Sequence, residues 1–275
     1  MRRRDILIQA CAGTAFLGLP YIASGQSAQY QRVRTSSKVK SPRKSHSLRR
    51  IADPTGRFDG KIEKFELRGG ECSSRRDCTP RVNSRGRMKA RTRSEKILTA
   101  RLRHGDEGVF QYSVFLPNDF TLIPSIGTTI GQFLNAYKVG SDDDDSHPLA
   151  SLDTNDGDPN VRLYFQMSEA RGTELERVNE EQYEVGRLAR DPELRNAWLD
   201  IQISFGLSTD SDGYVSVSLN RRRLGTFRGR TITRGGWVEA RYGLYQNFIN
   251  EFPGGHKAVP KQVAYYGNVG LFKKV

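Results

Sequence analysis

The sequence predicts an all-β protein built as a sandwich or barrel of short strands. After about residue 57, apolar and polar residues alternate with a period of two, as expected for strands that bury one face and expose the other. Clusters of turn-forming residues separate the alternating stretches, and only one stretch has helical character. Many short strands with few helices are typical of a β-sandwich or barrel, and no second domain boundary follows residue 57.

Four stretches carry the clearest alternation. In one of them, apolar Leu199, Ile201 and Ile203 are separated by single polar residues. The helical exception is residues 173–196, where Glu, Arg and Leu dominate and which Pro192 would interrupt. The four predicted strands cover residues 109–116, 161–167, 199–205 and 215–219, with turns at 117–119, 155–157, 210–213 and 253–255.

Residues 1–28 predict an export signal. A charged start with paired arginines (Arg2-Arg3-Arg4-Asp5-Ile6-Leu7) precedes a moderately apolar run to Ile22 and then small residues suited to cleavage. The Arg-Arg-x-x-Leu arrangement resembles a twin-arginine signal. An N-terminal membrane anchor is the alternative, although the apolar run is short for one. We therefore expect an exported protein, periplasmic or secreted, with no stable membrane insertion after cleavage of the signal.

Residues 29–56 predict a flexible basic linker, because they are rich in Ser, Lys, Arg and Gln and poor in apolar residues. The formal net charge of the chain is +13, but residues 1–50 account for +10 of it, with eleven Lys and Arg against Asp5 alone. The remainder is only mildly basic, so net charge does not indicate a nucleic-acid partner. The linker is a solvated tether or, alternatively, a weak contact to an anionic polymer. We expect the domain at 57–275 to be a monomer.

Two cysteines remain once the signal, which contains Cys11, is removed. Cys72 and Cys78 lie six residues apart in a turn-like segment, which in an exported protein predicts a local disulfide. Free thiols or a metal site are the alternatives, but no second pair of Cys or His has the spacing of a zinc site.

Three strand-like segments supply an arginine, an amide and a tyrosine. The first, Arg91–Glu95, continues a stripe in which Arg87, Lys89, Arg91 and Arg93 share one face of a strand. A guanidinium pairs well with a carboxylate, so Arg93 is a candidate for binding one. The alternative is a solvated basic face paired with acids such as Glu95.

The other two segments are Gly131–Leu134 and Arg241–Tyr245. The amide of Gln132 can donate to a carboxylate without ionising, although a solvent-facing glutamine would look the same in sequence. Arg241, Gly243 and Tyr245 share one face, and we expect the glycine to leave room for a sugar ring. The alternative for Tyr245 is an ordinary cross-strand aromatic pair.

These segments, in this order, resemble those of the jelly-roll polysaccharide lyases, the alginate, glucuronan and heparin-lyase-I-like families. Arg93-Ser94-Glu95 is similar to their Arg-Ser/Thr-Glu strand, Gln132 to the glutamine of Gln-x-His, and Arg241–Tyr245 to Lys-x-Gly-x-Tyr. The wider pattern resembles the heparin-lyase-I-like group most. It covers Glu66–Cys72, Asp77-Cys78, Tyr112–Pro117, Trp198–Asp200, Gly213–Val215 and Val263–Tyr266. The resemblance implies a single jelly-roll β-sandwich, concanavalin-like in fold.

The resemblance also implies roles in β-elimination of an anionic, uronate-containing polysaccharide. Arg93 and Gln132 would neutralise the uronate carboxylate, and Tyr245 would be the catalytic acid. Arg241 would hold substrate charge. Apart from the resemblance, we also expect Arg91, Lys89 and His147 to bind substrate. The histidine of Gln-x-His is replaced by Leu134, which cannot transfer a proton. Three alternatives follow: Tyr245 is also the base, or His104, His147 or His256 substitutes, or the protein binds carbohydrate without cleaving it.

We expect no cofactor and no metal. Calcium is not supported, because the acidic residues 142–145 and 153–158 lack the ligand spacing of an EF-hand loop. A glycoside hydrolase would need two carboxylates flanking the cleaved bond, and the sequence contains no Glu-x-Asp-x-x-Glu strand. The sequence therefore predicts an exported polysaccharide lyase, with a non-catalytic carbohydrate-binding protein as the alternative.

Overall fold

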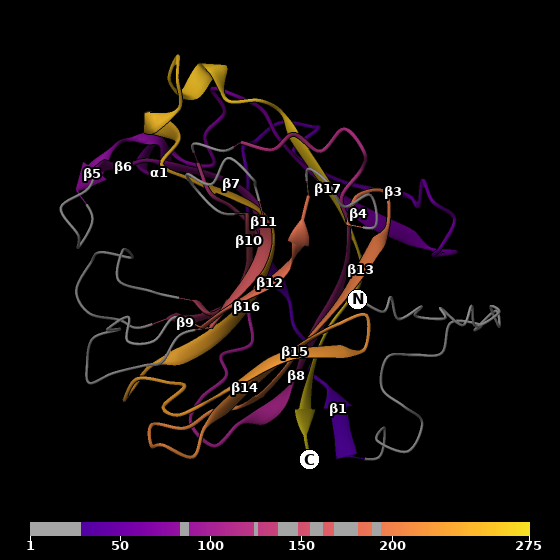
Figure 1. Cartoon of the computed structure of the whole chain (residues 1–275), viewed down its shortest axis with the longest axis vertical. Coiled ribbons are helices and arrows are strands. Elements are labelled where there is room, and N and C mark those ends of the chain that lie inside the picture. Colours follow the sequence, from indigo (N-terminus) through magenta and orange to yellow (C-terminus); the bar gives the residue numbers. More distant parts are fainter. Residues whose placement is uncertain are drawn as a thin grey trace, which may run out of the picture.

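Two large antiparallel sheets pack face to face in the computed structural model (Figure 1). It describes residues 29–82, 88–123, 126–136, 148–154, 162–167, 181–188 and 194–275. The eight-stranded sheet has the order β15-β14-β13-β8-β17-β4-β3, with β1 also paired to β17, and the seven-stranded sheet has the order β12-β11-β10-β9-β16-β7-β2. The predicted all-β sandwich is confirmed.

The elements follow each other along the chain with short helical turns at one end of the sandwich. The first part contains β1 (Tyr30–Arg32), β2 (Ser37–Lys40), β3 (Leu48–Ala52), β4 (Lys61–Leu67), α1 (Arg75–Cys78), β5 (Arg81–Val82), β6 (Met88–Lys89), β7 (Arg91–Leu98) and β8 (Glu107–Phe115). The second part contains β9 (Thr128–Ala136), β10 (Pro148–Thr154), β11 (Arg162–Met167), β12 (Glu181–Arg187), β13 (Trp198–Gly206), β14 (Tyr214–Leu219), β15 (Arg222–Arg228), β16 (Trp237–Asn247), η3 (Ile249–Glu251), η4 (His256–Ala258) and β17 (Gln262–Lys274).

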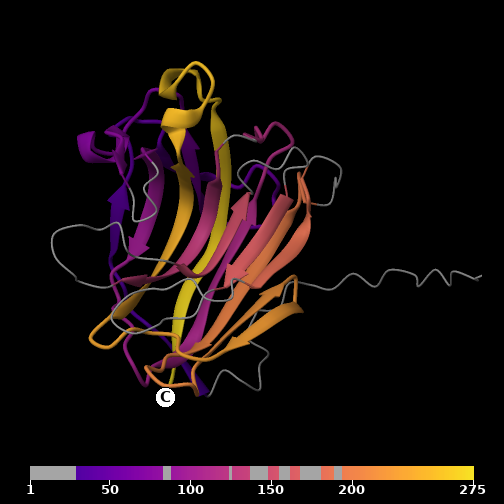
Figure 2. The same cartoon turned by 60° about the vertical axis from the view of Figure 1, so that its left-hand side comes forward.

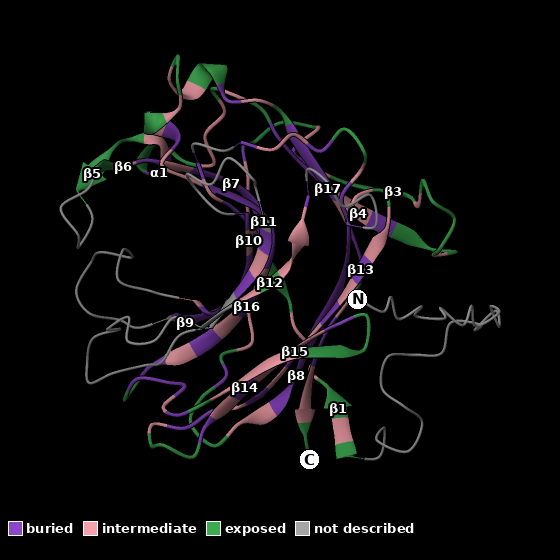
Figure 3. Ribbon diagram, in the orientation of Figure 1, coloured by how far each residue is buried: buried purple, intermediate pink, exposed green. Residues whose placement is uncertain are grey.

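The core lies between the two sheets, and the buried residues are concentrated in the strands of these sheets (Figure 3). Alternation along β13 is complete: every second residue is buried, from Leu199 to Phe205. Aromatic side chains from both sheets meet there, for example Phe110 with Phe133 and Phe65 with Tyr242. Such pairs add packing energy beyond the area that they bury.

The predicted helix at 173–196 is wrong over residues 181–187, which form strand β12 at the edge of the seven-stranded sheet. Tyr183 and Val185 pack against the core between the sheets. The ring of Tyr183 occupies the space that a side chain at Gly225 would need, 2.2 Å from the position of its missing Cβ. Burial of these residues in tertiary contacts overrides the helical propensity of their neighbours. The rest of the segment, apart from Leu188 and residues 194–196, lies outside the described residues.

The segment expected to be a linker, 29–56, contributes three strands instead. β1 pairs with β17, β2 with β7 and β3 with β4. Edge strands need few apolar residues, because their backbone hydrogen bonds are supplied by the sheet. A polar composition therefore concealed strands at the edges of both sheets.

The seven-stranded sheet curves, and its outer face is concave in Figure 1, with α1, β5 and β6 at its upper end. Figure 2 shows its strands side by side, from the indigo and purple strands at one edge to the salmon β11 and β12 at the other. In the described part of the chain, no helix is both long and apolar enough to cross a membrane.

Gly243 lies where β16 changes register against β9, between Tyr242 and Tyr245. Its φ is +123°, and a Cβ there would lie 2.4 Å from the carbonyl oxygen of Ser94 on β7. The glycine is therefore required by a β-bulge and a close backbone approach, and the expectation that it makes room for a sugar ring is wrong. The bulge fixes which residues of β16 face outward beyond it.

We expect Gly243→Ala to lower the free energy of unfolding by roughly 2–4 kcal/mol, because it combines an unfavourable φ with a backbone clash. Urea unfolding followed by fluorescence measures this loss. Gly105→Ala is the matched control, since Gly105 has a φ of +86° with nothing within 4 Å of its Cβ position. Equal losses in the two variants would show that the clash with β7 contributes nothing.

Candidate active site

Three central strands of the seven-stranded sheet bring the predicted site residues onto its concave face. Tyr245 on β16 lies directly opposite Arg93 on β7, and Arg241 lies opposite Gln132 on β9. Directly opposed residues of antiparallel strands point to the same side of a sheet. The structure therefore brings Arg93, Gln132 and Tyr245, which the resemblance grouped as catalytic, onto one face of the sheet.

The arginines of β7 are held by a carboxylate that the sequence analysis missed. Asp77, in the single turn of α1, accepts from Arg93 Nη2 at 2.7 Å and Nε at 3.0 Å, and from Arg91 Nε at 3.0 Å. Burial would raise the pKa of the Asp77 carboxyl, but the hydrogen bonds and charge of Arg93 hold it well below its usual range. Asp77 is therefore an anion bridging two guanidinium groups.

Glu95 and Gln132 form a second buried polar contact beside this cluster. Gln132 Nε2 donates to Glu95 Oε1 at 2.5 Å, and Glu95 Oε2 lies 3.6 Å from Arg93 Nη1. The side chain of Arg93 is only 5% exposed. Pairing of the basic stripe with Glu95 was one of the alternatives from sequence, but the pair is buried and not on a solvated face. Both Arg93 and Gln132 are thus engaged by protein carboxylates.

Tyr245 lies at the floor of the concave face, 9% exposed, with the guanidinium of Arg93 5.3 Å from its ring centre. Burial would raise the pKa of the Tyr245 hydroxyl, but the positive charges of Lys89, Arg91 and Arg93, with a hydrogen bond to Arg91, lower it below its ordinary value. A tyrosine in such a field can lose and regain its proton more readily than one in water.

The remaining predicted binding residues differ in their surroundings. Lys89 ends β6 and lies 5.8 Å from the ring of Phe248, and the side chain of Arg91 is 14% exposed, more than that of Arg93. Arg241 is paired with Glu239 at 2.7 Å, two residues away on the same strand. Arg87 and His147 lie outside the described residues, as do the signal at 1–28 and the acidic residues 142–145 and 155–158.

Leu134, at the position of the family histidine, is buried at 4% exposure and lies opposite Glu239 on β16. Of the histidines that the structure describes, His46 contacts Glu71 at 2.9 Å and His104 accepts from the backbone N–H of Thr209 at 3.1 Å. The first contact holds His46 against the residue before Cys72, and the second holds His104 against the loop that follows β13.

The disulfide between Cys72 and Cys78 is present, as predicted. His256 lies beside it, and its imidazole and the two sulfur atoms lie within 4.8 Å of one another. Since the sulfur atoms are bonded to each other, they offer no thiolate for a metal, so the three residues are not a zinc site in this state. Beyond these three, the described residues contain no cluster of His, Cys, Asp and Glu that could hold a metal ion.

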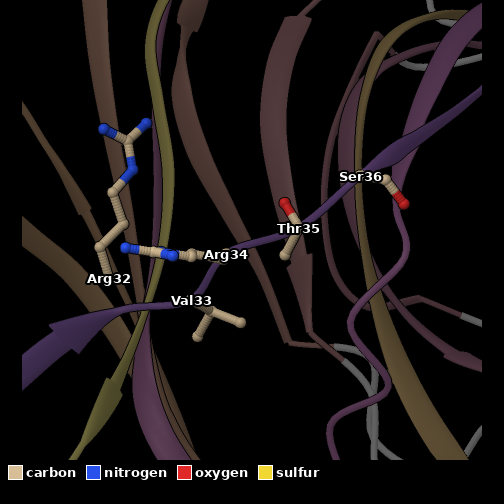
Figure 4. Close-up of a pocket in the computed structure, with 5 residues that line it drawn as sticks. All are labelled: Arg32, Val33, Arg34, Thr35 and Ser36. Carbon is tan, nitrogen blue, oxygen red and sulfur yellow. The ribbon is translucent and has the colours of Figure 1, made fainter.

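A hollow of about 510 Å³ lies elsewhere, along the segment that passes from β1 to β2. Figure 4 shows the residues that line it, Arg32 to Ser36. None of the predicted site residues lines it, and Arg32 in it donates to the backbone carbonyl of Val269 at 3.1 Å. The chemistry-bearing groups are on the open concave face instead.

Comparison with known proteins agrees with this fold. A family model described as polysaccharide lyase matches residues 22–270. An endo-β-1,4-glucuronan lyase from the fungus Trichoderma reesei has a similar structure, with a TM-score of 0.59, 16% identity, and coverage of 88% of this chain and 95% of that chain. So does the alginate lyase AlgAT5 of polysaccharide lyase family 7, with a TM-score of 0.52, 11% identity, and coverage of 87% and 94%.

A search of curated proteins by sequence finds no match. At such low identities the structural similarity shows the fold alone, a jelly-roll sandwich, and the family model supplies the membership. The model begins at residue 22, so it includes the strands β1, β2 and β3. A match over most of the chain, on a fold that solved lyases share and with an arginine, an amide and a tyrosine on one concave face, shows that the chain belongs to the polysaccharide lyase family.

Proposed function

We propose that this lyase is exported and cleaves a uronate-containing polysaccharide by β-elimination, with Tyr245 as both the base and the acid. One observation carries the proposal: the Tyr245 hydroxyl lies among Lys89, Arg91 and Arg93, which lower its pKa despite its burial. The likeness to glucuronan and alginate lyases supports an anionic substrate. The disulfide supports an oxidising, exported location.

The reaction requires three things of the site. The C5 proton of a uronate is weakly acidic, so the adjacent carboxylate must be neutralised as negative charge develops. A base must remove that proton, and an acid must protonate the departing O4 as the C4–O4 bond breaks and the C4–C5 double bond forms. A phenolate of Tyr245 can take the proton from C5 and return it to O4, which balances the reaction.

The contacts of each cation indicate its role in the reaction. Arg93 is held by Asp77 and Glu95, so it supplies charge and rigidity beside Tyr245. Lys89 and the more exposed Arg91 are better placed to contact the substrate carboxylate. Gln132, bound to Glu95, keeps that carboxylate turned toward Arg93. This assignment moves direct carboxylate binding from Arg93 and Gln132 to Arg91 and Lys89.

A single proton-transferring group also limits the substrate. If Tyr245 serves C5 and O4 in turn, both must lie on the same face of the sugar ring. D-Glucuronate and D-mannuronate meet this condition, whereas their C5 epimers, L-iduronate and L-guluronate, do not. The proposal therefore favours polymers of D-configured uronates. The finer resemblance to heparin-lyase-I-like enzymes stays a prediction that the same comparison of substrates tests.

The test is to incubate the purified protein with polyglucuronate, polymannuronate, polyguluronate and heparin-type glycans. Ultraviolet absorbance of the new C4–C5 double bond reports cleavage. We expect product from polyglucuronate or polymannuronate and at least about tenfold less from polyguluronate, since the transfers must share one face. Cleavage of polyguluronate alone would exclude Tyr245 as the sole proton carrier.

The non-catalytic alternative is favoured by Leu134, because the usual base is missing there. Binding to one of these polymers without any product would support it over the proposed lyase. Calorimetry on the same panel measures that binding.

No histidine should be essential if Tyr245 carries both proton transfers. We expect His46→Gln, His104→Gln, His147→Gln and His256→Gln each to keep kcat within about threefold of the parent, because general acid–base groups contribute far more than that. Initial rates on the best polymer measure this. A loss of about a hundredfold in one variant, with its unfolding transition unchanged, would identify that histidine as the base.

A further inference from the structure

The disulfide-closed loop of residues 72–78 encloses Asp77. Within it, Ser74 caps α1 by accepting from the backbone N–H of Asp77 at 3.2 Å, and the hydroxyl of Ser73 donates to the Asp77 carboxylate. The loop is also fixed to β7, because Thr92 Oγ1 donates to the carbonyl oxygen of Glu71 at 2.7 Å. Asp77 is thus carried by a short ring that is tied to the strand bearing its partners.

Both oxygens of Asp77 are occupied by donors. Oδ1 accepts from Arg91 and Arg93, and Oδ2 accepts from Arg93 and Ser73. The side chain is 7% exposed, so water competes little for these bonds. A two-point contact fixes the plane of the Arg93 guanidinium, which one point charge would not do.

We propose, building on the lyase function above, that Asp77 is a positioning residue of this reaction: the disulfide loop holds its carboxylate so that Arg91 and Arg93 are fixed against the Tyr245 hydroxyl. Without Asp77, the two guanidinium groups would repel each other and could turn toward Glu95 or solvent. The loop would then serve the active site, and not only the stability of the fold.

Charged groups from four elements act on Tyr245 or lie beside the groups that do. The cations are Lys89 of β6 with Arg91 and Arg93 of β7. The anions are Asp77 of α1 and Glu95 of β7, which contact Arg93, and Asp153 of β10. Asp153 lies opposite Thr129 of β9, and Thr129 lies opposite Tyr245. Removing the negative charge of Asp77 leaves the three cations less balanced, which stabilises the phenolate and lowers the pKa of Tyr245 further.

Two substitutions separate position from charge. Asp77→Glu keeps the charge but moves the carboxylate, so we expect kcat to fall at least about tenfold while the acid limb of the pH–rate profile stays in place. Asp77→Asn removes the charge, so we expect a similar or larger fall in kcat and an acid limb shifted to lower pH by at least about half a unit.

Glu66→Gln is the matched control. Glu66 lies on the eight-stranded sheet, is 3% exposed, and pairs with two cations, Lys64 and Arg68, each at 2.6 Å. Its loss should lower the unfolding temperature as Asp77→Asn does, without altering kcat or the acid limb. Removing the disulfide with Cys72→Ser and Cys78→Ser together should lower kcat, as Asp77→Glu does.

Two results would overturn the proposal. One is a kcat for Asp77→Glu within about twofold of the parent. The other is a fall in kcat in both Asp77 variants that is no larger than in Glu66→Gln, with the acid limb unmoved. If Asp77→Asn does not fold, Asp77→Glu decides. If the parent cleaves no polymer, that result contradicts the lyase function and not the coupling of Asp77 to Tyr245. The ultraviolet titration of Tyr245, taken as the difference from Tyr245→Phe, then tests the coupling, and an unshifted titration in Asp77→Asn would refute it.

Discussion

Tyr245→Phe is expected to reduce kcat by about a thousandfold or more, because it removes the group assigned to both proton transfers. The hydroxyl is the only part of the side chain that changes, and the ring that lies 5.3 Å from the Arg93 guanidinium remains. Substrate binding should therefore persist, since Lys89 and Arg91 keep their charges. Initial rates from double-bond absorbance measure kcat, and calorimetry measures affinity for the uncleaved polymer.

Tyr265→Phe serves as the control for this substitution. Tyr265 lies on β17 of the eight-stranded sheet, packed against Phe115, and has no place in the proposed chemistry. It should keep the activity of the parent. If Tyr245→Phe retained more than about a tenth of kcat, the proton would have another carrier, and the assignment to Tyr245 would be wrong.

Arg93→Ala is expected to lower the free energy of unfolding by roughly 3–5 kcal/mol, because it leaves Asp77 and Glu95 as buried carboxylates without their shared cation. In a domain of this size such a loss lowers the unfolding temperature by on the order of 10 °C. Cleavage should also be lost, since the positive charge beside Tyr245 disappears. Differential scanning calorimetry with urea unfolding measures the stability term.

Arg57→Ala provides the comparison for an exposed ion pair. Arg57 Nη2 lies 2.7 Å from Asp200 Oδ2, but the side chain of Arg57 is 38% exposed. We therefore expect the free energy of unfolding to fall by at most about 1 kcal/mol. Arg93→Lys tests geometry separately, because lysine keeps the charge but cannot make the two-point contact with Asp77. Equal stability in Arg93→Ala and Arg57→Ala would contradict the view that burial makes the Arg93 cluster costly to break.

The sequence predicted the elements whose signal is local. Strands such as β13 and β14 show complete alternation, since one face packs on the core and the other meets solvent. β12 and the strands of 29–56 were missed because their stability comes from pairing with distant strands, which composition does not encode. Contacts distant in sequence decide such edges.

Some residues of the site could likewise be predicted from the sequence, and others could not. Parity within a strand is readable from sequence, so Arg91 and Arg93 were expected on one face of β7. The grouping of Arg93 with Gln132 and Tyr245 came from the resemblance to lyases, because parity does not relate one strand to another. Asp77 was not found, because it acts from a one-turn helix fourteen or more residues away from the arginines that it holds. The two cysteines of this segment were the available signal, since a disulfide-closed loop fixes the side chains that it contains against a neighbouring element. The engagement of Gln132 by Glu95 depends on the register of three strands, which sequence alone does not provide.

The segment from β1 to β2 joins both sheets, so removing it would affect both of them. β2 covers the edge of β7 along residues 95–98, next to the arginines of the site. A protease that removed the chain as far as residue 40 would uncover a row of unpaired backbone donors and acceptors on that strand, a template for pairing with another molecule. A cut before Ser37 would leave β2 in place, keep the edge of β7 covered and avoid intermolecular sheet growth and aggregation.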